Sequence, residues 1–372
     1  RLYQVQKELL DQLSMDIYKE DMIMKIIVLE EDSAPNERFF KFGAGICRTL
    51  REKGHDAFLL DPFLGLPDAG EDLEAVFKRP DAGLGIASGI RSTEPDLEAG
   101  KALREDKSDC FFGVNVIELC RLADIVFMGL HGDVGENGKL QASFDVLGIR
   151  YTGPSSLGCA LSMDKEITKV IFEANQIPTP KGTWMKKSAS IIPLLPPDFS
   201  PARGKTMIGG SSIGVYFAHT EEEFDQAVRE SFRYEDEIII EEYIKGRELA
   251  CGVIDGKALP VIEICPKNGW FDYANKYQDG ATEEVCPANI SEEISERMKE
   301  LTVRAFHALK LNVYSRADFL LDEKGNLYCL EVNTLPGMTA ASLLPKEANA
   351  AGIAYGDLCE LIINKSLEAR YE

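Results

Sequence analysis

The sequence predicts an α/β N-terminal unit built on an open parallel sheet, followed by a larger part with mixed α+β structure. Near the N-terminus, short apolar strands alternate with helical segments, which is the arrangement of a parallel sheet. After Tyr151 this alternation ends, and residues 186–208 are rich in Pro, Ser and Lys. From about residue 250 the pattern is mixed and closes with a helix. These three observations define the predicted fold class.

The composition excludes several classes of partner. The 372 residues carry 41 Lys and Arg against 62 Asp and Glu, a formal net charge of −21. Nucleic acids and anionic membrane surfaces are bound by clustered basic side chains, so neither is an expected partner. The sequence has neither the run of about 18 apolar residues typical of a transmembrane helix nor the apolar stretch of a signal peptide. A cytoplasmic location is therefore expected. The nine cysteines lie mostly in apolar segments, which favours buried free thiols.

The elements of the N-terminal unit are expected to begin at Met24. Residues 3–20 have loosely helical spacing and are expected to form an appended extension. The expected strands are KIIVLEE, HDAFLLDP and DIVFMGLHG, and the expected helices are residues 38–54 and VNVIELCRLA. Residues 64–108 are acidic and punctuated by Gly and Pro, which predicts loops with short helices.

The elements after Tyr151 follow a different pattern. LGCALSMDKEITKVIFEANQ has apolar residues at helical spacing and carries Lys165 and Lys169 one turn apart. No strand is expected in residues 186–208. The next elements are a Gly-Ser turn leading into a strand in GGSSIGVYFAH and a helix whose capping box starts at Thr220. A strand pair interrupted at Gly246 and the closing helix GDLCELIINKSLEAR complete the prediction.

The most informative segment is YSRADFLLDEKGNLYCLEVNTLPGMT, which predicts a β-hairpin. A hairpin that turns at Lys324 and Gly325 places Asp318 directly opposite Glu331. Because side chains alternate between the faces of a strand, four polar residues then share one face. They are Arg316, Asp318, Glu331 and Asn333.

This polar face on an apolar hairpin is a candidate metal site. Unpaired buried charge is costly, and a hard divalent cation such as Mg²⁺ takes carboxylate and amide oxygens as ligands. The alternative is a solvated strand face with an Arg–carboxylate pair, because surface ion pairs cost little. The spacing alone leaves both interpretations open.

Three further segments are candidate ligand sites. GGSSIG at 209–214, with Lys205 before it, can donate backbone N–H groups and hydroxyls to a phosphate, or it is a flexible turn. In EEYIKGRE, carboxylates can reach ribose hydroxyls while the backbone of Tyr243 and Ile244 contacts a base, or the segment is an acidic connector. HGDVGENG follows a strand end, where ligand sites of α/β sheets lie, so His131 is either functional or a cap.

Taken in order, these segments resemble the D-alanine–D-alanine ligases of the ATP-grasp superfamily from about Met24 to the C-terminus. The resemblance is carried by HGDVGENGKLQASFDVLGIRYTGPSS, ALSMDK, IPTP, GGSSIGV, EEYIKGRE, FDYANKY, RADF and LEVNTLPGMTAASLLP. It implies an ATP-grasp fold with an N-terminal open parallel α/β domain. The implied divisions are an extension (1–23), an N-terminal domain for the first substrate (24–157), a central lid domain (158–247) and a C-terminal domain (248–372) with the Mg²⁺ and second-substrate sites.

The resemblance also implies a reaction. Two D-alanines would be joined to D-alanyl-D-alanine, for peptidoglycan precursors of the cell wall, through an acyl phosphate formed with ATP. The implied cofactor is a pair of Mg²⁺ ions, for which Mn²⁺ can substitute. The implied assembly is a homodimer.

The resemblance assigns roles around the nucleotide residue by residue. The implied metal ligands are Asp318, Glu331 and Asn333. The implied phosphate ligands are Lys165 and Lys205, with Ser211 and Ser212 in the loop that closes over the γ-phosphate. The implied adenosine contacts are Glu241, Glu242, Tyr243, Ile244 and Glu248.

Other matched positions are implied to handle the amino acids. Arg316 and the N–H of Gly337 would stabilise the oxyanion. Glu37 and His131 would receive the first D-alanine, and Ser342 and Leu343 would meet the carboxylate of the second. Lys276 and Tyr277 match a mobile lid, with Lys276 facing the transferred phosphate.

Two segments depart from the family pattern. EEDSAPNERFFKFG has acidic residues where the family has glycines, two extra residues before Glu37, and Lys41 where a serine is usual. PDFSPARGKTMI replaces an apolar strand before the Gly-Ser loop. The alternatives are therefore a D-alanine–D-serine ligase, or a nucleotide-binding homologue whose catalysis is impaired by the altered loops at 30–45 and 186–208. The Lys-Tyr pair of FDYANKY favours an amine over D-lactate as the second substrate.

Overall fold

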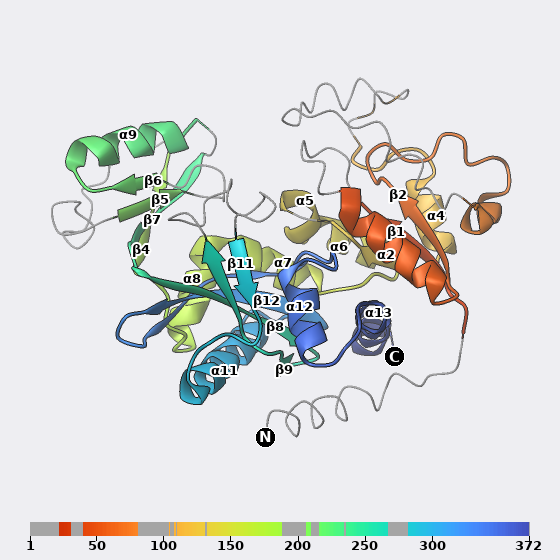
Figure 1. Cartoon of the computed structure of the whole chain (residues 1–372). Helices are drawn as coiled ribbons and strands as arrows, with labels where there is room; N and C mark the ends of the chain where they lie inside the picture. Colours follow the sequence, from red (N-terminus) through yellow and green to blue (C-terminus); the bar gives the residue numbers. More distant parts are fainter. Residues whose placement is uncertain are drawn as a thin grey trace.

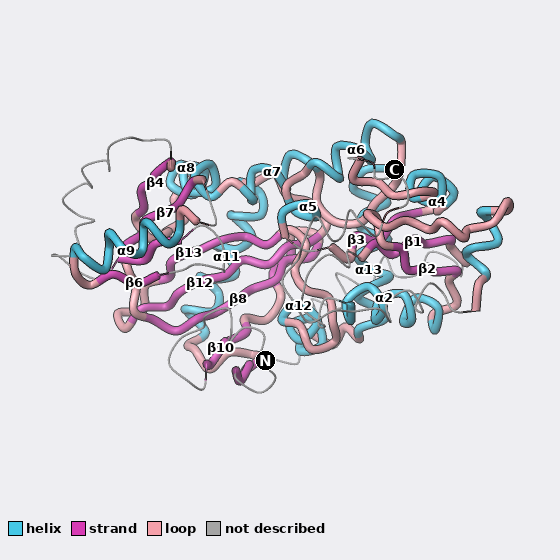
Figure 2. The backbone as a smooth tube through the Cα atoms, turned by 90° about the horizontal axis from the view of Figure 1, so that it is seen from above, coloured by secondary structure: helices cyan, strands magenta, loops and turns pink. Residues whose placement is uncertain are grey.

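The computed structural model describes residues 22–30, 40–80, 104, 108, 110–130, 132–187, 206–209, 216–233, 236–266 and 282–371. In this part of the chain the strands form three sheets, of three, six and four strands. Figure 1 shows the three-stranded sheet at one end of the molecule, the four-stranded sheet at the other and the six-stranded sheet between them; Figure 2 shows the same order from above.

The N-terminal unit is the predicted open parallel sheet. It has the order β2-β1-β3, formed by β1 (Lys25–Leu29), β2 (Asp56–Leu60) and β3 (Ile125–Met128). Its strands are buried over nearly their whole length, as expected for a parallel sheet covered on both faces. The surrounding helices are α2 (Phe40–Glu52), the 3₁₀ helix η1 (Leu73–Lys78) and α4 (Val116–Leu122).

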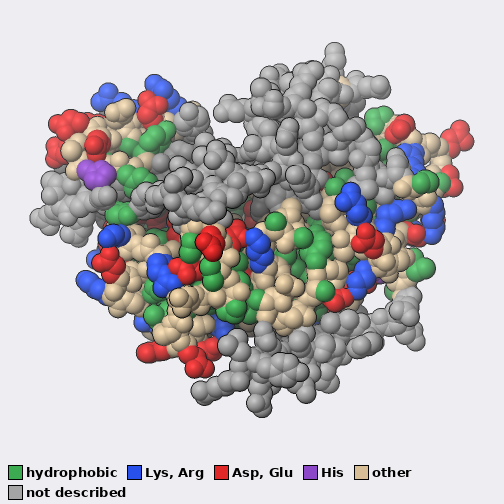
Figure 3. All heavy atoms as spheres, in the orientation of Figure 1, with side chains coloured by type: hydrophobic (Ala, Val, Ile, Leu, Met, Phe, Trp, Pro, Cys, Tyr) green, Lys and Arg blue, Asp and Glu red, His purple; other side chains and the backbone are tan. Residues whose placement is uncertain are grey.

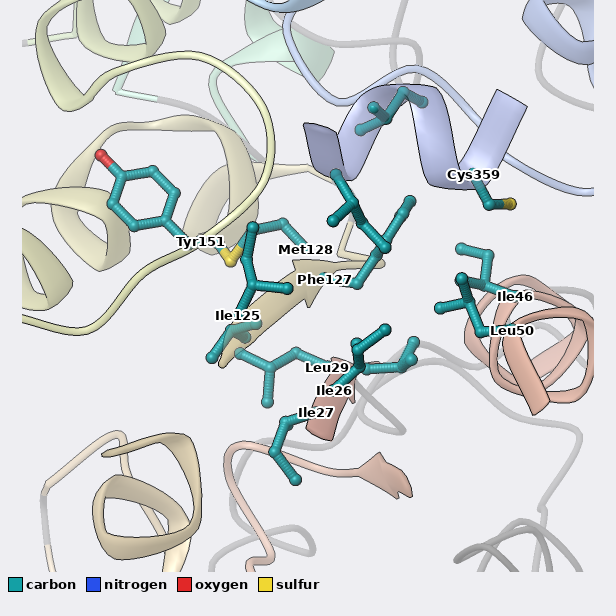
Figure 4. Packing of buried hydrophobic residues seen from close by; sticks show 14 of the residues in the cluster. Ile26, Ile27, Leu29, Ile46, Leu50, Ile125, Phe127, Met128, Tyr151 and Cys359 are labelled. Carbon is teal, nitrogen blue, oxygen red and sulfur yellow. The ribbon is translucent and has the colours of Figure 1, made fainter. Parts of the chain in front are cut away.

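The C-terminal helix also covers this sheet. Helix α13 (Tyr355–Tyr371) contributes Leu358, Cys359 and Ile362 to the same apolar core as β1–β3. Figure 4 shows Cys359 beside Ile46 and Leu50 of α2. The end of the sequence, which the predicted division gives to the C-terminal domain, therefore also completes the core of the N-terminal sheet.

Four helices connect the first sheet to the rest: α5 (Asp133–Glu136), α6 (Lys139–Leu147), α7 (Ser156–Met163) and α8 (Lys165–Ala174). The continuous helix predicted across the last two is wrong. Asp164 has extended backbone angles, and its carboxylate accepts the Ile167 N–H at 2.9 Å, so it ends one helix and caps the next. Gly138 has a φ of +84°, and a Cβ there would lie 2.3 Å from the Ser156 carbonyl, which explains the glycine where α6 meets α7.

The four-stranded sheet is antiparallel, in the order β4-β7-β5-β6, and packs against α9 (Glu221–Ser231). Its strands are β4 (Gly182–Lys186), β5 (Thr206–Gly209), β6 (Tyr216–Ala218) and β7 (Glu237–Glu242). The predicted cap is confirmed, because the Thr220 hydroxyl accepts the Glu223 N–H at 3.2 Å. The expectation of no strand in 186–208 is wrong at both margins: Lys186 is the last residue of β4, and pairing with β7 and β6 makes residues 206–209 extended despite their weak local pattern.

The six-stranded sheet has the order β11-β10-β8-β12-β13, with β9 beside β8. Its strands are β8 (Gly246–Ile254), β9 (Lys257–Ala258), β10 (Ile262–Pro266), β11 (Thr282–Val285), β12 (Tyr314–Asp322) and β13 (Leu327–Asn333). Helix α11 (Glu292–Ala308) packs against it, and α12 (Leu343–Ala350) contacts β8. The predicted strand pair around Gly246 is wrong as a pair, because β7 and β8 join different sheets.

The nine cysteines are all free, as predicted. Cys47, Cys120, Cys159, Cys251, Cys329 and Cys359 are buried. Burial raises the pKa of the Cys47 thiol to about 12, so this thiol stays protonated at neutral pH.

The described surface carries charge of both signs. On the face shown in Figure 3, basic and acidic side chains are interspersed. Among the described helices, none is both long enough and apolar enough to cross a lipid bilayer.

Candidate active site

The β12–β13 hairpin brings four polar side chains to one face of the six-stranded sheet. Arg316 pairs with Asn333, and Asp318 pairs with Glu331, as predicted. The alternate residues, among them Ala317, Phe319, Cys329 and Val332, are buried in the core that includes α11. The neighbouring strand β8 places Glu248, Ala250 and Gly252 opposite Leu320, Asp318 and Arg316. Apolar packing on one face therefore orients the polar row on the other.

The predicted register is right at this site but wrong at the turn. The turn contains three residues instead of two: the Asp322 N–H bonds the Asn326 carbonyl at 3.0 Å, and Gly325 has a φ of +83°. Phe319 therefore pairs with Cys329, and a bulge at Leu330 shifts the register before Asp318 meets Glu331. The extra residue in the turn and the extra residue in the bulge offset each other.

Arg316 and Asp318 form a two-point ion pair. Nε and Nη2 of Arg316 donate to the two carboxylate oxygens at 2.7 and 2.8 Å, and Asn333 Nδ2 donates to Asp318 Oδ2 at 3.0 Å. The two charged side chains are only 14% and 17% exposed. Burial alone would lower the pKa of Arg316, but the attraction and hydrogen bonds of Asp318 outweigh it and raise that pKa. Arg316 is therefore a fixed, permanent cation.

Lys165 joins this row from another element. It is the first residue of α8, and its Nζ lies 3.1 Å from Glu331 Oε2. The side chains of Lys165 and Glu331 are 39% and 33% exposed, so this ion pair contributes little stability and can exchange partners at low cost. The structure thus brings the predicted phosphate lysine to a predicted metal carboxylate.

A buried loop follows the hairpin and contains Gly337. At its start, Glu136 Oε1 accepts the Thr334 N–H at 3.0 Å, the Leu335 N–H at 2.8 Å and the Thr334 hydroxyl at 3.2 Å. At its end, the Tyr355 hydroxyl donates to the Met338 carbonyl at 2.6 Å. Gly337 is therefore held between two anchors from outside the hairpin.

Ser342 and Leu343 lie at the start of α12. Ser342 is the N-cap residue, and its Oγ accepts the Thr339 N–H at 3.1 Å and lies 2.8 Å from Thr339 Oγ1. Leu343 packs against the small apolar cluster of Ala250, Ile262 and Ile264 beside the polar row. Helix α12 thus begins next to the sheet face that carries Arg316.

The predicted adenosine carboxylates differ in their surroundings. Glu241 is buried and lies 2.5 Å from Lys169 Nζ, which also donates to Thr179 Oγ1 at 2.8 Å and to the Pro180 carbonyl at 2.7 Å. The Glu241 carboxylate is therefore already engaged inside the protein. Sequence reasoning assigned no role to Lys169, although its position one turn after Lys165 was a signal.

The other predicted adenosine residues lie at the junction of the two larger sheets. Glu242 Oε1 accepts the Lys181 N–H at 2.9 Å, and the Tyr243 ring packs edge-on against Phe217 with centroids 5.7 Å apart. Tyr243 and Ile244 lie between β7 and β8, and Glu248 is on β8 in the sheet with the polar row.

Seven predicted residues lie outside the described residues: Glu37, His131, Lys205, Ser211, Ser212, Lys276 and Tyr277.

Two family models match the chain. The model for the D-ala D-ala ligase N-terminus matches residues 80–154, and that for the D-ala D-ala ligase C-terminus matches residues 198–364. The altered loop at 30–45 and most of the one at 186–208 lie outside the matched ranges.

Similar proteins span nearly the whole chain. A D-alanine–D-alanine ligase from Pediococcus pentosaceus is 42% identical over 344 residues, which cover 91% of this chain and 97% of the relative. The chain belongs to the D-alanine–D-alanine ligase family. The D-alanine–D-alanine ligase from Lacticaseibacillus casei is 39% identical over 350 residues, covering 93% of this chain and 96% of that protein.

A solved structure supports the same fold. The D-alanine–D-alanine ligase from Bacillus anthracis, crystallised in complex with ATP, superimposes with a TM-score of 0.70 at 28% identity, covering 93% of this chain and 98% of that one. The ATP-grasp fold expected of a D-alanine–D-alanine ligase is therefore confirmed.

Two acidic residues of this ligase-family chain were missed by sequence reasoning. Glu136 lies in HGDVGENG. An acidic residue in a Gly-rich loop after a strand end could have indicated its role. Glu347 on α12 is fully buried; its Oε1 accepts the Gly252 N–H at 3.1 Å. Burial raises the pKa of Glu347 well above its ordinary value, although Arg316 and the Gly252 N–H act in the opposite direction. Its sequence surroundings, LLPKEANA, gave no signal of this environment.

Glu136 should stabilise the loop that contains Gly337. Glu136→Ala leaves the N–H groups of Thr334 and Leu335 without their acceptor, so the free energy of unfolding should fall by about 1–3 kcal/mol. Amide hydrogen exchange at Leu335 should accelerate. Urea unfolding and exchange measured by mass spectrometry test this, with Glu173→Ala on the exposed side of α8 as the control. Unchanged exchange at Leu335 would contradict the anchoring role.

Glu347 should make the stability of the fold depend on pH. Because the folded pKa of Glu347 is raised, the folded state keeps a proton that the unfolded state releases as pH rises above the unfolded value near 4.5. The wild type should therefore lose stability relative to Glu347→Gln with rising pH, and the two should converge at low pH. Thermal unfolding from pH 4 to pH 8 measures the difference. The exposed Glu173→Gln is the control, and its stability difference from the wild type should stay constant with pH. If the difference between Glu347→Gln and the wild type also stays constant, the pKa of Glu347 is not raised.

Proposed function

We infer that this chain is an ATP-dependent ligase that joins two D-alanines to D-alanyl-D-alanine for peptidoglycan precursors. The observation that carries this inference is the row of Arg316, Asp318, Glu331 and Asn333 on one sheet face, in contact with Lys165 from α8. A fixed cation (Arg316) and an exchangeable one (Lys165) beside oxygen donors suit a reaction that moves a phosphoryl group and then forms an oxyanion. Membership of the D-alanine–D-alanine ligase family supports the choice of substrates.

The oxygen donors of this row fit a magnesium ion. Among the described residues, no group of three or more His, Cys, Asp or Glu side chains is arranged to hold a metal, but this row pairs two carboxylates with the Asn333 amide. Carboxylate and amide oxygens with limited exposure match the preference of Mg²⁺, which keeps open positions for phosphate oxygens. Asp318, Glu331 and Asn333 would hold it, and when bound it supplies positive charge next to the phosphates. We propose Mg²⁺ as the metal, with two ions per site and Mn²⁺ as a substitute.

The first chemical step is phosphoryl transfer to the first D-alanine. A carboxylate oxygen attacks the γ-phosphorus of ATP, the bond to the bridging oxygen breaks, and ADP leaves with that electron pair. Lys165, whose ion pair with Glu331 is half-exposed, is placed to turn its charge toward the phosphates. We propose the same role for Lys205, with Ser211 and Ser212 closing over the γ-phosphate. The adenosine would be held by Glu242, Tyr243, Ile244 and Glu248, and Glu241 would act through Lys169 rather than by direct contact.

The second step is attack by the amine of the second D-alanine on the acyl carbon. The carbonyl electrons move to oxygen, collapse of this tetrahedral oxyanion expels inorganic phosphate, and the departing phosphate takes up the proton that the amine loses. Arg316 is a permanent cation on the sheet face, and Gly337 lies in a loop anchored at both ends, so both suit the stabilisation of an oxyanion. Ser342 and Leu343 would meet the carboxylate of this second amino acid.

The remaining assignments rest on the family alone. We propose that Glu37 and His131 receive the first D-alanine and that Lys276 and Tyr277 form the lid. A cytoplasmic homodimer completes the proposal, and D-alanine rather than D-serine is the proposed second substrate.

The test is a ligation assay with variants of the polar row. The wild type with ATP, Mg²⁺ and D-alanine should release phosphate and form the dipeptide, detected by mass spectrometry. Asp318→Asn and Glu331→Gln should lower kcat by at least about 100-fold, the scale of losing a preorganised electrostatic group in an active site. Glu323→Gln, at the exposed hairpin turn, is the matched control and should keep wild-type kcat.

Two results would contradict the proposal. Wild-type protein that neither hydrolyses ATP nor forms dipeptide would exclude the activity. Full activity in Asp318→Asn and Glu331→Gln would exclude this row as the site. A parallel incubation with D-serine, read by the mass of the product, decides between the two acceptors.

A further inference from the structure

Glu347 lies on the helix that begins at the proposed acceptor residues. It is one turn after Leu343 on α12, and its side chain points at β8 rather than into solvent. The residue is fully buried, and Oε1 accepts the Gly252 N–H at 3.1 Å. This hydrogen bond ties α12 directly to the six-stranded sheet.

The carboxyl of Glu347 occupies the place of a missing side chain beside Arg316. Gly252 is the cross-strand partner of Arg316, so the two positions share a face of the sheet. A Cβ at Gly252 would lie 2.8 Å from Glu347 Oε2 and 2.4 Å from Leu344 Cδ1. The glycine therefore leaves a gap, and α12 fills it with a carboxyl group that becomes the lateral neighbour of Arg316.

This arrangement is costly for stability alone. Among the described residues, Oε2 of Glu347 has no hydrogen-bond partner. Burying a carboxyl with an unsatisfied oxygen is unfavourable, although Oε1 supplies the acceptor that the Gly252 N–H needs. Arg316 is held by Asp318 along one edge of its guanidinium, and its positive charge opposes the rise in the pKa of Glu347 that burial causes. The Gly252 N–H accounts for one oxygen of this carboxyl, and a functional constraint on Arg316 accounts for the second, unsatisfied one.

We propose that Glu347 is a positioning residue, which fixes the Arg316 guanidinium relative to the start of α12 and thereby sets the capture and attack geometry of the second amino acid. This inference deepens the proposed function and rests on it for its kinetic consequence. Glu347 itself has no contact with substrate in this account. Its effect is transmitted through Arg316 and through the position of Ser342 and Leu343.

The experiment compares an apolar and a conservative replacement. Glu347→Leu should raise the KM for the second D-alanine about tenfold, within the range of coupling between neighbouring side chains, while the KM for ATP stays unchanged. Its melting temperature should fall modestly, because the Gly252 N–H loses its acceptor, whereas Glu347→Gln keeps that acceptor and should melt at or above the wild type at neutral pH. Glu347→Gln keeps an oxygen for the Gly252 N–H and a polar group beside Arg316, so it should restore the KM. Glu347→Met, whose unbranched chain adapts to irregular space, replaces the leucine variant if that variant does not fold.

A second readout does not depend on ligase activity. The Arg316 Nε–H, assigned by its loss in Arg316→Lys, reports the rigidity of the guanidinium through ¹⁵N NMR relaxation. Its order parameter should fall in the apolar variant and recover in Glu347→Gln. If wild-type protein makes no dipeptide, the proposed function fails and this readout alone decides the positioning role.

Either of two results would overturn the proposal. The first is an unchanged Arg316 order parameter in the apolar variant. The second is a Glu347→Gln variant as impaired as Glu347→Leu, because a requirement for the carboxylate itself would make Glu347 a proton acceptor rather than a positioning residue.

Discussion

The two-point ion pair between Arg316 and Asp318 is the constraint on which the site depends. Two hydrogen bonds fix the plane of the guanidinium, and Asn333 bonds the same carboxylate from the facing strand. A largely buried pair of this kind is rigid because neither charge can lose its partner without a large cost in free energy. The cation therefore stays on the sheet face as a permanent electrostatic feature, whereas the more exposed contact between Lys165 and Glu331 is free to change.

The rest of the fold holds this hairpin against the N-terminal unit. Glu136, which comes from the segment after β3, takes three hydrogen bonds from the start of the loop that contains Gly337. Tyr355, the first residue of α13, bonds the end of that loop, while the same helix packs on the N-terminal sheet. The backbone N–H proposed for the oxyanion is therefore positioned by a residue that follows the N-terminal sheet and by the C-terminal helix, and ligand sites often lie between domains in this way.

The sequence predicted the parallel sheet and the polar face because both follow from periodicity. It reached the pairing of Asp318 with Glu331 through a turn that was one residue too short, since neither the three-residue turn nor the bulge at Leu330 has a periodic signal. The ion pair of Lys169 with Glu241 and the buried carboxyl of Glu347 depend on contacts between distant elements, so local pattern could not reveal them. The strand at 206–209 exists through its pairing with β7 and β6, again a tertiary effect.

A crystal structure of the complex with ADP and Mg²⁺ tests the central claim most directly. The account predicts a metal bound by oxygens of Asp318, Glu331 and Asn333, with the Arg316–Asp318 pair retained and Lys165 Nζ moved from Glu331 to a phosphate oxygen. A metal and nucleotide bound away from this sheet face, with Lys165 still on Glu331, would contradict it.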